Sequence, residues 1–143
     1  MWFAFAEAVT WAGMLAALLV RFSGATDALV GPAGGIHGFV FLTYCVATAC
    51  VWIDGRWLPG TGLTGLLASV IPFATVFFEL WADRRGLLAG SWRLGAGGEQ
   101  PRMFAERVLA WALRYAALAI GVGVALVIAV FLVLLWLGPP VQF

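Results

Sequence analysis

The chain has 143 residues, of which 64% are hydrophobic and only 10% charged, and its mean hydropathy is +1.02. Soluble domains are usually about 45–50% apolar and about 25% charged, so the composition excludes an ordinary soluble domain and a disordered chain. The formal charge of +1 argues against a nucleic-acid partner, which would require a strongly basic face.

Four apolar stretches are long enough to cross a hydrocarbon core of about 30 Å, which requires about 20 helical residues. They cover about residues 2–21, 33–53 and 62–82, and a fourth that begins between 103 and 115 and ends near 137. Gly and Pro mark the breaks between them. The sequence therefore predicts an all-α integral membrane bundle of four transmembrane helices. A three-span unit (1–86) is followed by a connection (87–102) and by an amphipathic start and fourth helix (103–143).

Arginines set the expected orientation, because cytoplasmic loops carry an excess of basic residues. The first loop begins at Arg21 and the second holds only Arg56, whereas the third connection and its edges are rich in arginine: Arg84, Arg85, Arg93, Arg102 and Arg107. We expect a multi-pass protein of the inner (cytoplasmic) membrane, with the 83–106 connection in the cytoplasm and both termini outside. No signal-peptide pattern precedes the first span, which we expect to be retained.

Small residues recur at every fourth position in the first and last spans, where they would let helix backbones approach closely. The rows are Ala4, Ala8, Ala12 and Ala16, and Ala117, Gly121, Ala125 and Ala129. They predict packing seams within the bundle or against another chain, although a simple abundance of alanine would give the same pattern. Pro72 is expected to kink the third span.

Ionisable residues within spans are costly and mark candidate functional sites. Matching the midpoints of antiparallel spans places His37, Glu79 and Arg21 in one layer near the cytoplasmic side. This predicted cluster has two interpretations. It is either a proton-responsive or ligand-holding site, because imidazole changes charge near neutral pH, or an interhelical clamp without further function.

A second set of polar residues is expected nearer the outer side: Glu7, Tyr44, Thr48 and Ser69. If the polar faces of the second and third spans meet, these residues form a line that could carry protons or a small solute. Alternatively, Thr48 only bonds back to its own helix.

Catalytic and cofactor patterns are lacking in the sequence. A single His, and two Cys that are not at ligand spacing, argue against a self-contained zinc site, and no nucleophile-elbow or phosphate-loop motif occurs. We therefore expect no metal, no cofactor and no enzymatic activity. Cys45 and Cys50 are expected to be free thiols.

Three groups of residues resemble a bacterial integral membrane family, domain of unknown function 3817. They are Ala6-Glu7-Ala8, Ile36-His37-Gly38 with Tyr44, and Ala68-Ser69-Val70-Ile71-Pro72-Phe73 leading to Glu79. The resemblance covers about residues 5–86 and implies a three-span membrane unit with no assigned activity. The family usually has basic residues directly after the third-span acid, whereas here four residues (80–83) intervene before Arg84. The segment after about residue 86 lies outside the resemblance.

Two functions are compatible with these features. The first is an accessory or assembly subunit of a larger membrane complex, respiratory or otherwise energy-transducing, embedded in the lipid bilayer beside partner subunits or as a homo-oligomer. The alternative is a small conduit for protons or a solute that uses the intramembrane Glu, His and Tyr residues.

Overall fold

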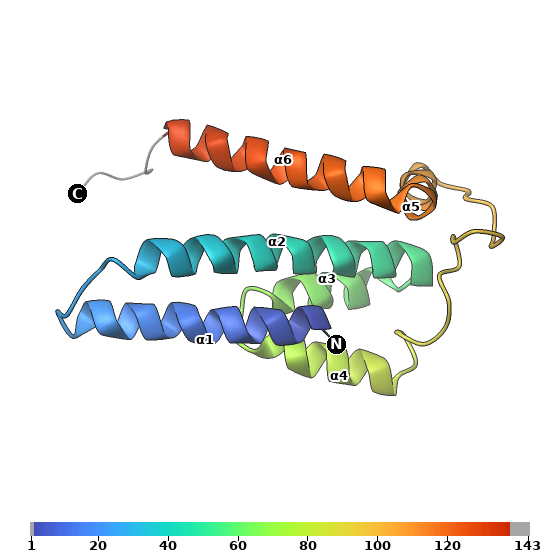
Figure 1. Cartoon of the computed structure of the whole chain (residues 1–143). Coiled ribbons are helices and arrows are strands. Elements are labelled where there is room, and N and C mark those ends of the chain that lie inside the picture. Colours follow the sequence, from blue (N-terminus) through green and yellow to red (C-terminus); the bar gives the residue numbers. More distant parts are fainter. Residues whose placement is uncertain (1, 138–143) are drawn as a thin grey trace. The chain divides into compact units, whose positions relative to one another are not determined.

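A computed structural model describes residues 2–137, without the side chains at positions 127, 130, 131, 134, 135 and 137. All regular structure in this range is helical: α1 (Trp2–Phe22), α2 (Val30–Gly55), α3 (Pro59–Ala68), α4 (Ala74–Arg84), α5 (Phe104–Arg114) and α6 (Ala116–Leu137) (Figure 1). The chain divides into two compact units, one up to Ser91 and the other from Trp92 onward.

The first unit is built on the antiparallel pair α1 and α2 (Figure 1). Both helices are apolar over most of their surface, as expected for helices surrounded by lipid. The positive φ of Gly24 helps the loop between them to turn back. The buried face of α1 contains Ala4, Glu7 and Ala17, so a carboxyl group lies within the packed side of the helix.

The predicted third span is not one continuous helix. It forms α3 and α4, two short helices of 10 and 11 residues that are joined by residues 69–73 and fold into a hairpin (Figure 1). The proline-containing link reverses the chain instead of kinking a helix. The Ala68 carbonyl, which a kink at Pro72 would have left free, accepts a bond from the Ile71 amide at 3.2 Å. Phe73 starts α4 with a left-handed φ of 66°.

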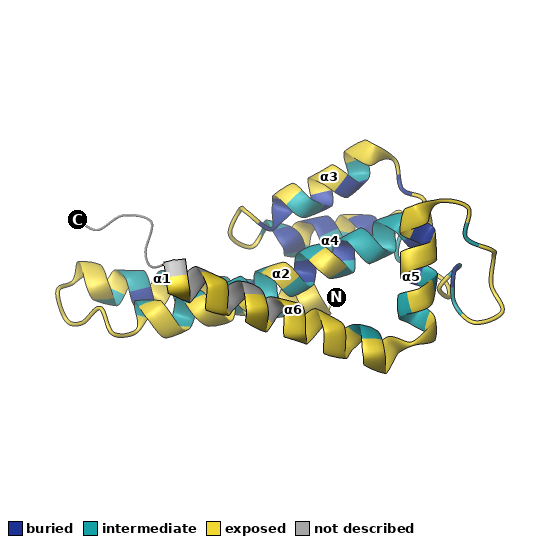
Figure 2. Ribbon diagram, turned by 90° about the horizontal axis from the view of Figure 1, so that it is seen from above, coloured by how far each residue is buried: buried dark blue, intermediate teal, exposed yellow. Residues whose placement is uncertain are grey.

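Two glycines allow the hairpin to pack tightly. A Cβ atom at Gly65 would lie 2.8 Å from the Phe78 ring of α4 and 3.0 Å from the Thr48 methyl group of α2. A Cβ atom at Gly62 would overlap the Trp52 ring. Only glycine fits where three helices approach this closely. Figure 2 shows buried residues gathered on α3, α4 and the adjacent part of α2.

Two tryptophans close the corner between α2 and α3. The Trp52 indole donates to the Trp57 carbonyl at 3.0 Å, and the Trp57 indole donates to the Leu87 carbonyl at 3.3 Å. The Trp57 ring also packs edge-on against Phe78 in the buried apolar cluster. These contacts join the start of α3 to the end of α4 and thereby close the hairpin.

The hairpin changes the expected topology. Trp2 and Phe5 line the same groove as Glu79 and Leu80, so the start of α1 lies beside the end of α4. The first residues of the chain and the connection after α4 therefore share one side of this unit. The prediction that they lie on opposite sides assumed that residues 62–82 form one helix across the bilayer, whereas these residues form the hairpin.

In the second unit, the amphipathic helix α5 and the apolar helix α6 meet at a bend of 110°. Tyr115 lies at the bend, where its φ of −118° and ψ of 51° end α5. The predicted amphipathic start of the fourth span is thus a separate helix.

The described residues contain two helices, α1 and α2, that are long and apolar enough to span a membrane, and a third if the bent pair α5 and α6 counts as one span. The fold is therefore all-α with transmembrane helices, as predicted, but the count of four spans is not confirmed.

Only part of the predicted packing seams is buried in the structure. In α1, Ala4 is buried and Ala8 half-buried, whereas Ala12 and Ala16 are exposed. A spacing of four residues exceeds one helical turn by about 40°, so the row rotates away from the buried face. In α6 the whole predicted row is exposed: Ala117, Gly121, Ala125 and Ala129.

Candidate functional site

Five buried polar side chains form the centre of the first unit, and we refer to them as the polar core. They come from α1, α2, α4 and the residue that caps α3: Glu7, Tyr44, Thr48, Ser69 and Thr75. Glu7, Ser69 and Thr75 are fully buried. The structure thus brings together the four predicted outer polar residues and adds Thr75.

Two members of the polar core, Tyr44 and Ser69, donate to backbone carbonyls. The Tyr44 hydroxyl donates to the Gly65 carbonyl at 3.2 Å, and the Ser69 hydroxyl donates to the Leu66 carbonyl at 2.6 Å. The Ser69 oxygen also lies 3.6 Å from the Cys45 sulfur. These bonds attach α2 to α3 and satisfy carbonyls at the end of a short helix, where the regular helical bonds run out.

Glu7 and Thr75 differ from the rest of the core. They lie beside one another, on α1 and α4. Among the described residues, neither carboxyl oxygen of Glu7 nor the Thr75 hydroxyl has a hydrogen-bond partner that meets ordinary geometry. A buried carboxyl group in this state is unusual, because burial normally requires that polar atoms be paired.

His37 lies further along the α1–α2 pair, away from the hairpin. Its Nδ1 is 3.1 Å from the Thr10 hydroxyl oxygen, and its ring packs against Trp11 with a centroid separation of 4.4 Å. The Thr10 hydroxyl also bonds to the Glu7 carbonyl at 2.9 Å. His37 is therefore part of an α1–α2 contact.

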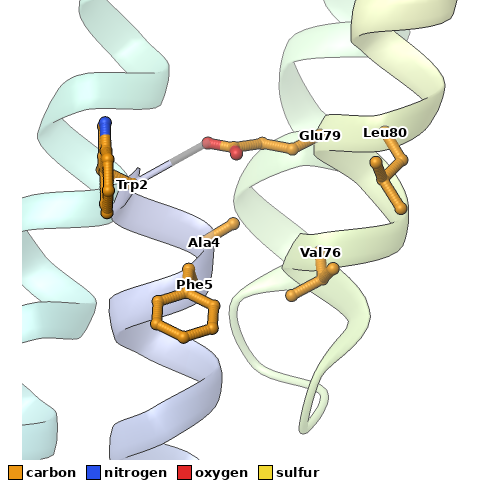
Figure 3. Close-up of a pocket in the computed structure, with 6 residues that line it drawn as sticks. All are labelled: Trp2, Ala4, Phe5, Val76, Glu79 and Leu80. Carbon is orange, nitrogen blue, oxygen red and sulfur yellow. The ribbon is translucent and has the colours of Figure 1, made fainter.

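Glu79 lies at an apolar groove of about 290 Å³ at the other end of α1. Figure 3 shows it extending from α4 toward the first turn of α1. The remaining lining residues are apolar: Trp2, Ala4, Phe5, Val76 and Leu80. Electrostatically, Tyr44 is within range of both Glu79 and Glu7.

The structure does not bring His37, Glu79 and Arg21 together. His37 contacts Thr10 and Trp11, and Glu79 lies near Trp2, about two and a half helical turns away along α1. Arg21 is exposed in the last turn of α1. Glu79 is separated from His37 because α4 runs back toward the start of α1 instead of continuing toward its end.

Thr75 was missed from the sequence. A threonine in an apolar helix usually bonds to its own backbone, and Thr43 and Thr64 do so here. The available signal was the interval of four residues that places Thr75 on the same helix face as Glu79. Its depth beside Glu7 depends on the hairpin, which the sequence pattern did not reveal.

The second unit contains a charged cluster with a different character. The Glu106 side chain is 1% exposed and accepts bonds from the Arg93 guanidinium at 2.7 Å and the Arg102 amide at 2.7 Å. The Met103 amide is 3.4 Å away. The Arg102 amide and then the Arg93 guanidinium hold the pKa of Glu106 at about 2. This cluster fixes the start of α5, where unpaired amides favour a carboxylate.

Within residues 2–137, no group of three or more His, Cys, Asp or Glu side chains could hold a metal ion. Cys45 and Cys50 are free, as predicted. The polar chemistry available among the described residues of the first unit is thus that of two buried carboxyl groups, Glu7 and Asp54, several hydroxyl groups and one imidazole.

Residues 1–84 match the family described as domain of unknown function, DUF3817. The chain belongs to the DUF3817 family. This match confirms the resemblance inferred from the three sequence motifs. It covers α1 to α4 and therefore includes the whole polar core.

A protein of Streptomyces coelicolor, described by its name as a membrane protein, is 43% identical over 89 residues, which are 61% of the present chain. These residues make up only 10% of the relative, so the chain spans about a tenth of the length of that protein. No solved structure matches the chain. Together with the apolar helices, these findings identify a membrane protein from a family without an assigned function.

Proposed function

We propose that this DUF3817 protein is a non-catalytic membrane module that works as a subunit of a larger membrane assembly. The proposal depends mainly on the turn of the α3–α4 hairpin. A helix of 10 residues extends about 15 Å, which is about half of the hydrocarbon core, so the turn lies at membrane depth. Non-helical backbone at that depth is tolerated only where protein or a water-filled cavity covers it.

The turn is apolar, and the described residues of the first unit leave it uncovered. Val70 and Ile71 are 61% and 60% exposed, and Phe73 is also exposed. An apolar turn is a poor lining for a water-filled cavity, so protein is the better cover. The Streptomyces relative supports the same view, because its matching region is a small part of a much longer membrane protein.

Arginine counts favour a revised orientation for the module. With the hairpin, one side carries five arginines, namely Arg56, Arg84, Arg85, Arg93 and Arg102, and the loop between α1 and α2 carries only Arg21. Residues 85–103 contain no helix and cannot cross the bilayer. In a bacterial inner membrane, the rule of positive charge inside therefore places the first residues and the connection in the cytoplasm.

Photo-cross-linking tests the subunit proposal. A benzophenone amino acid at Ile71, irradiated in native membranes, is expected to give one or a few discrete protein adducts, whose mass distinguishes a second copy from another chain. The matched control is Leu19, which is similarly exposed but lies on a continuous helix that lipid can cover. Adducts with lipid alone at Ile71 would contradict the proposal.

A second candidate is a conduit for protons or a small solute, which the polar core favours. It predicts that reconstituted vesicles show a flux that Glu7→Gln abolishes and His37→Ala leaves largely intact, since only Glu7 belongs to the core. Equal flux in both variants and in the unchanged protein would exclude this function.

A further inference from the structure

Glu7 is a buried acid to which no other residue of the described range 2–137 supplies a countercharge. It is fully buried, and neither of its oxygens has a hydrogen-bond partner among the described residues. The ion pairs of the described residues do not include it. Its neighbour Thr75 is equally buried and equally unpaired. Two adjacent buried polar groups without other partners among the described residues require an explanation, because buried polar atoms are normally paired.

Among the described residues, the titratable groups that share the surroundings of Glu7 carry no positive charge. Tyr44 on α2 is within electrostatic range of Glu7, of Cys45 on its own helix and of Glu79 on α4, and all of these are acids. His37, the basic side chain on α2, is engaged with Thr10 and the Trp11 ring.

Ionised Glu7 would thus be a bare charge in a site of low dielectric, the state that proteins avoid by pairing the group or by neutralising it. The tyrosine hydroxyl that could stabilise a carboxylate donates instead to the Gly65 carbonyl. A bound proton removes the charge. It also gives the carboxyl group an O–H donor, for which the Thr75 oxygen is the adjacent acceptor.

We propose that Glu7 is a proton-binding site, in which the proton replaces a counter-ion and is shared between the carboxyl group and the Thr75 hydroxyl. This site lies between α1 and the α3–α4 hairpin. It does not depend on whether the module has a partner, and failure of the cross-linking experiment would leave it unaffected.

An apolar carbodiimide tests the proposal, because it reacts with protonated carboxyl groups inside the membrane. The acid adds across one C=N bond: its proton goes to nitrogen, its oxygen bonds to the central carbon, and nothing leaves. Mass spectrometry of the full chain in native membranes locates the adduct. At about pH 8, where an ordinary carboxyl group is almost fully ionised, we expect about tenfold more adduct on Glu7 than on exposed acids such as Glu99.

Three variants test whether the labelling comes from Glu7 itself and depends on Thr75. Glu7→Gln should abolish the adduct at this position, whereas Glu79→Gln should leave it, although Glu79 is also close to Tyr44. Thr75→Val, which keeps the shape of the side chain, should change the pH at which Glu7 labelling falls by half. A melting temperature close to that of the unchanged protein shows that each variant is folded.

Two results would overturn the proposal. One is the absence of labelling at Glu7 at about pH 5, in the folded protein, while exposed acids react. A protonated buried acid should react at that pH. The other is protection of Glu7 by Na⁺ at constant pH and ionic strength, which would assign the site to a metal cation. Loss of labelling with rising pH, without protection by Na⁺, supports it.

Discussion

At the scale of single residues, the two acids that are most fully buried are treated in opposite ways. Glu106 is buried with a guanidinium and backbone amides directed at it, and it is held as a carboxylate. Glu7 is buried with no such partners. The sequence singled out Glu7, which lies within an apolar span, but not Glu106. The role of Glu106 could not be predicted, because it depends on a loop conformation that brings Arg93 back to it.

The bonds to Glu106 predict a pH-dependent connection. Because its pKa is lowered to about 2, its stabilising effect is complete above the unfolded value of about 4.3 and is lost as the pH falls from there toward 2. In the Glu106→Gln variant, residues 93–106 should therefore open more often at neutral pH. We expect their amide hydrogens to exchange severalfold faster than in the unchanged protein.

Glu99→Gln is the control, because this exposed acid is 3.3 Å from the same arginine and a surface pair contributes little. If the amide hydrogens of residues 93–106 exchange at the same rate in both variants, the Glu106 bonds do not hold the start of α5.

At the scale of helices, hydropathy and length identified α1 and α2 and the apolar segment of α6. They could not identify the hairpin. Residues 62–82 have the length and composition of a crossing helix, and Pro72 alone is as compatible with a kink as with a reversal. What decides between them is packing. Gly65 on α3 admits the Phe78 ring of α4, and this contact exists only when α4 folds back.

The close approach at Gly65 gives a direct prediction. Gly65→Ala places a methyl group 2.8 Å from the Phe78 ring and should destabilise the fold by about 1–3 kcal/mol, the usual cost of overpacking. Thermal unfolding in mild detergent measures the loss.

Gly60→Ala, on the same helix with nothing within 4 Å, should cause no loss of stability. A continuous third helix would not bring Gly65 onto Phe78, so equal stability of the two variants would contradict the hairpin.

At the scale of the whole molecule, a hairpin in place of a continuous third span has two consequences. It changes the expected sides of the loops, and it changes which polar residues meet. The sequence correctly predicted a helical membrane protein and its family. It also singled out Glu7, Tyr44, Thr48 and Ser69, which the structure places in the polar core. The depth of each residue in the membrane could not be predicted, because it depended on counting complete crossings. One reversal at residues 69–73 separates Glu79 from His37 and brings Thr75 to Glu7.

The sidedness of two loops tests this account most directly. In a Cys45→Ala, Cys50→Ala background, single cysteines replace Ala25, between α1 and α2, and Ala96, after α4, and a membrane-impermeant thiol reagent is added to intact cells. The hairpin predicts that the two loops lie on opposite sides, with Ala25→Cys labelled from outside and Ala96→Cys labelled only after lysis. If both positions react from the same side, residues 59–84 cross the membrane completely and the account is contradicted.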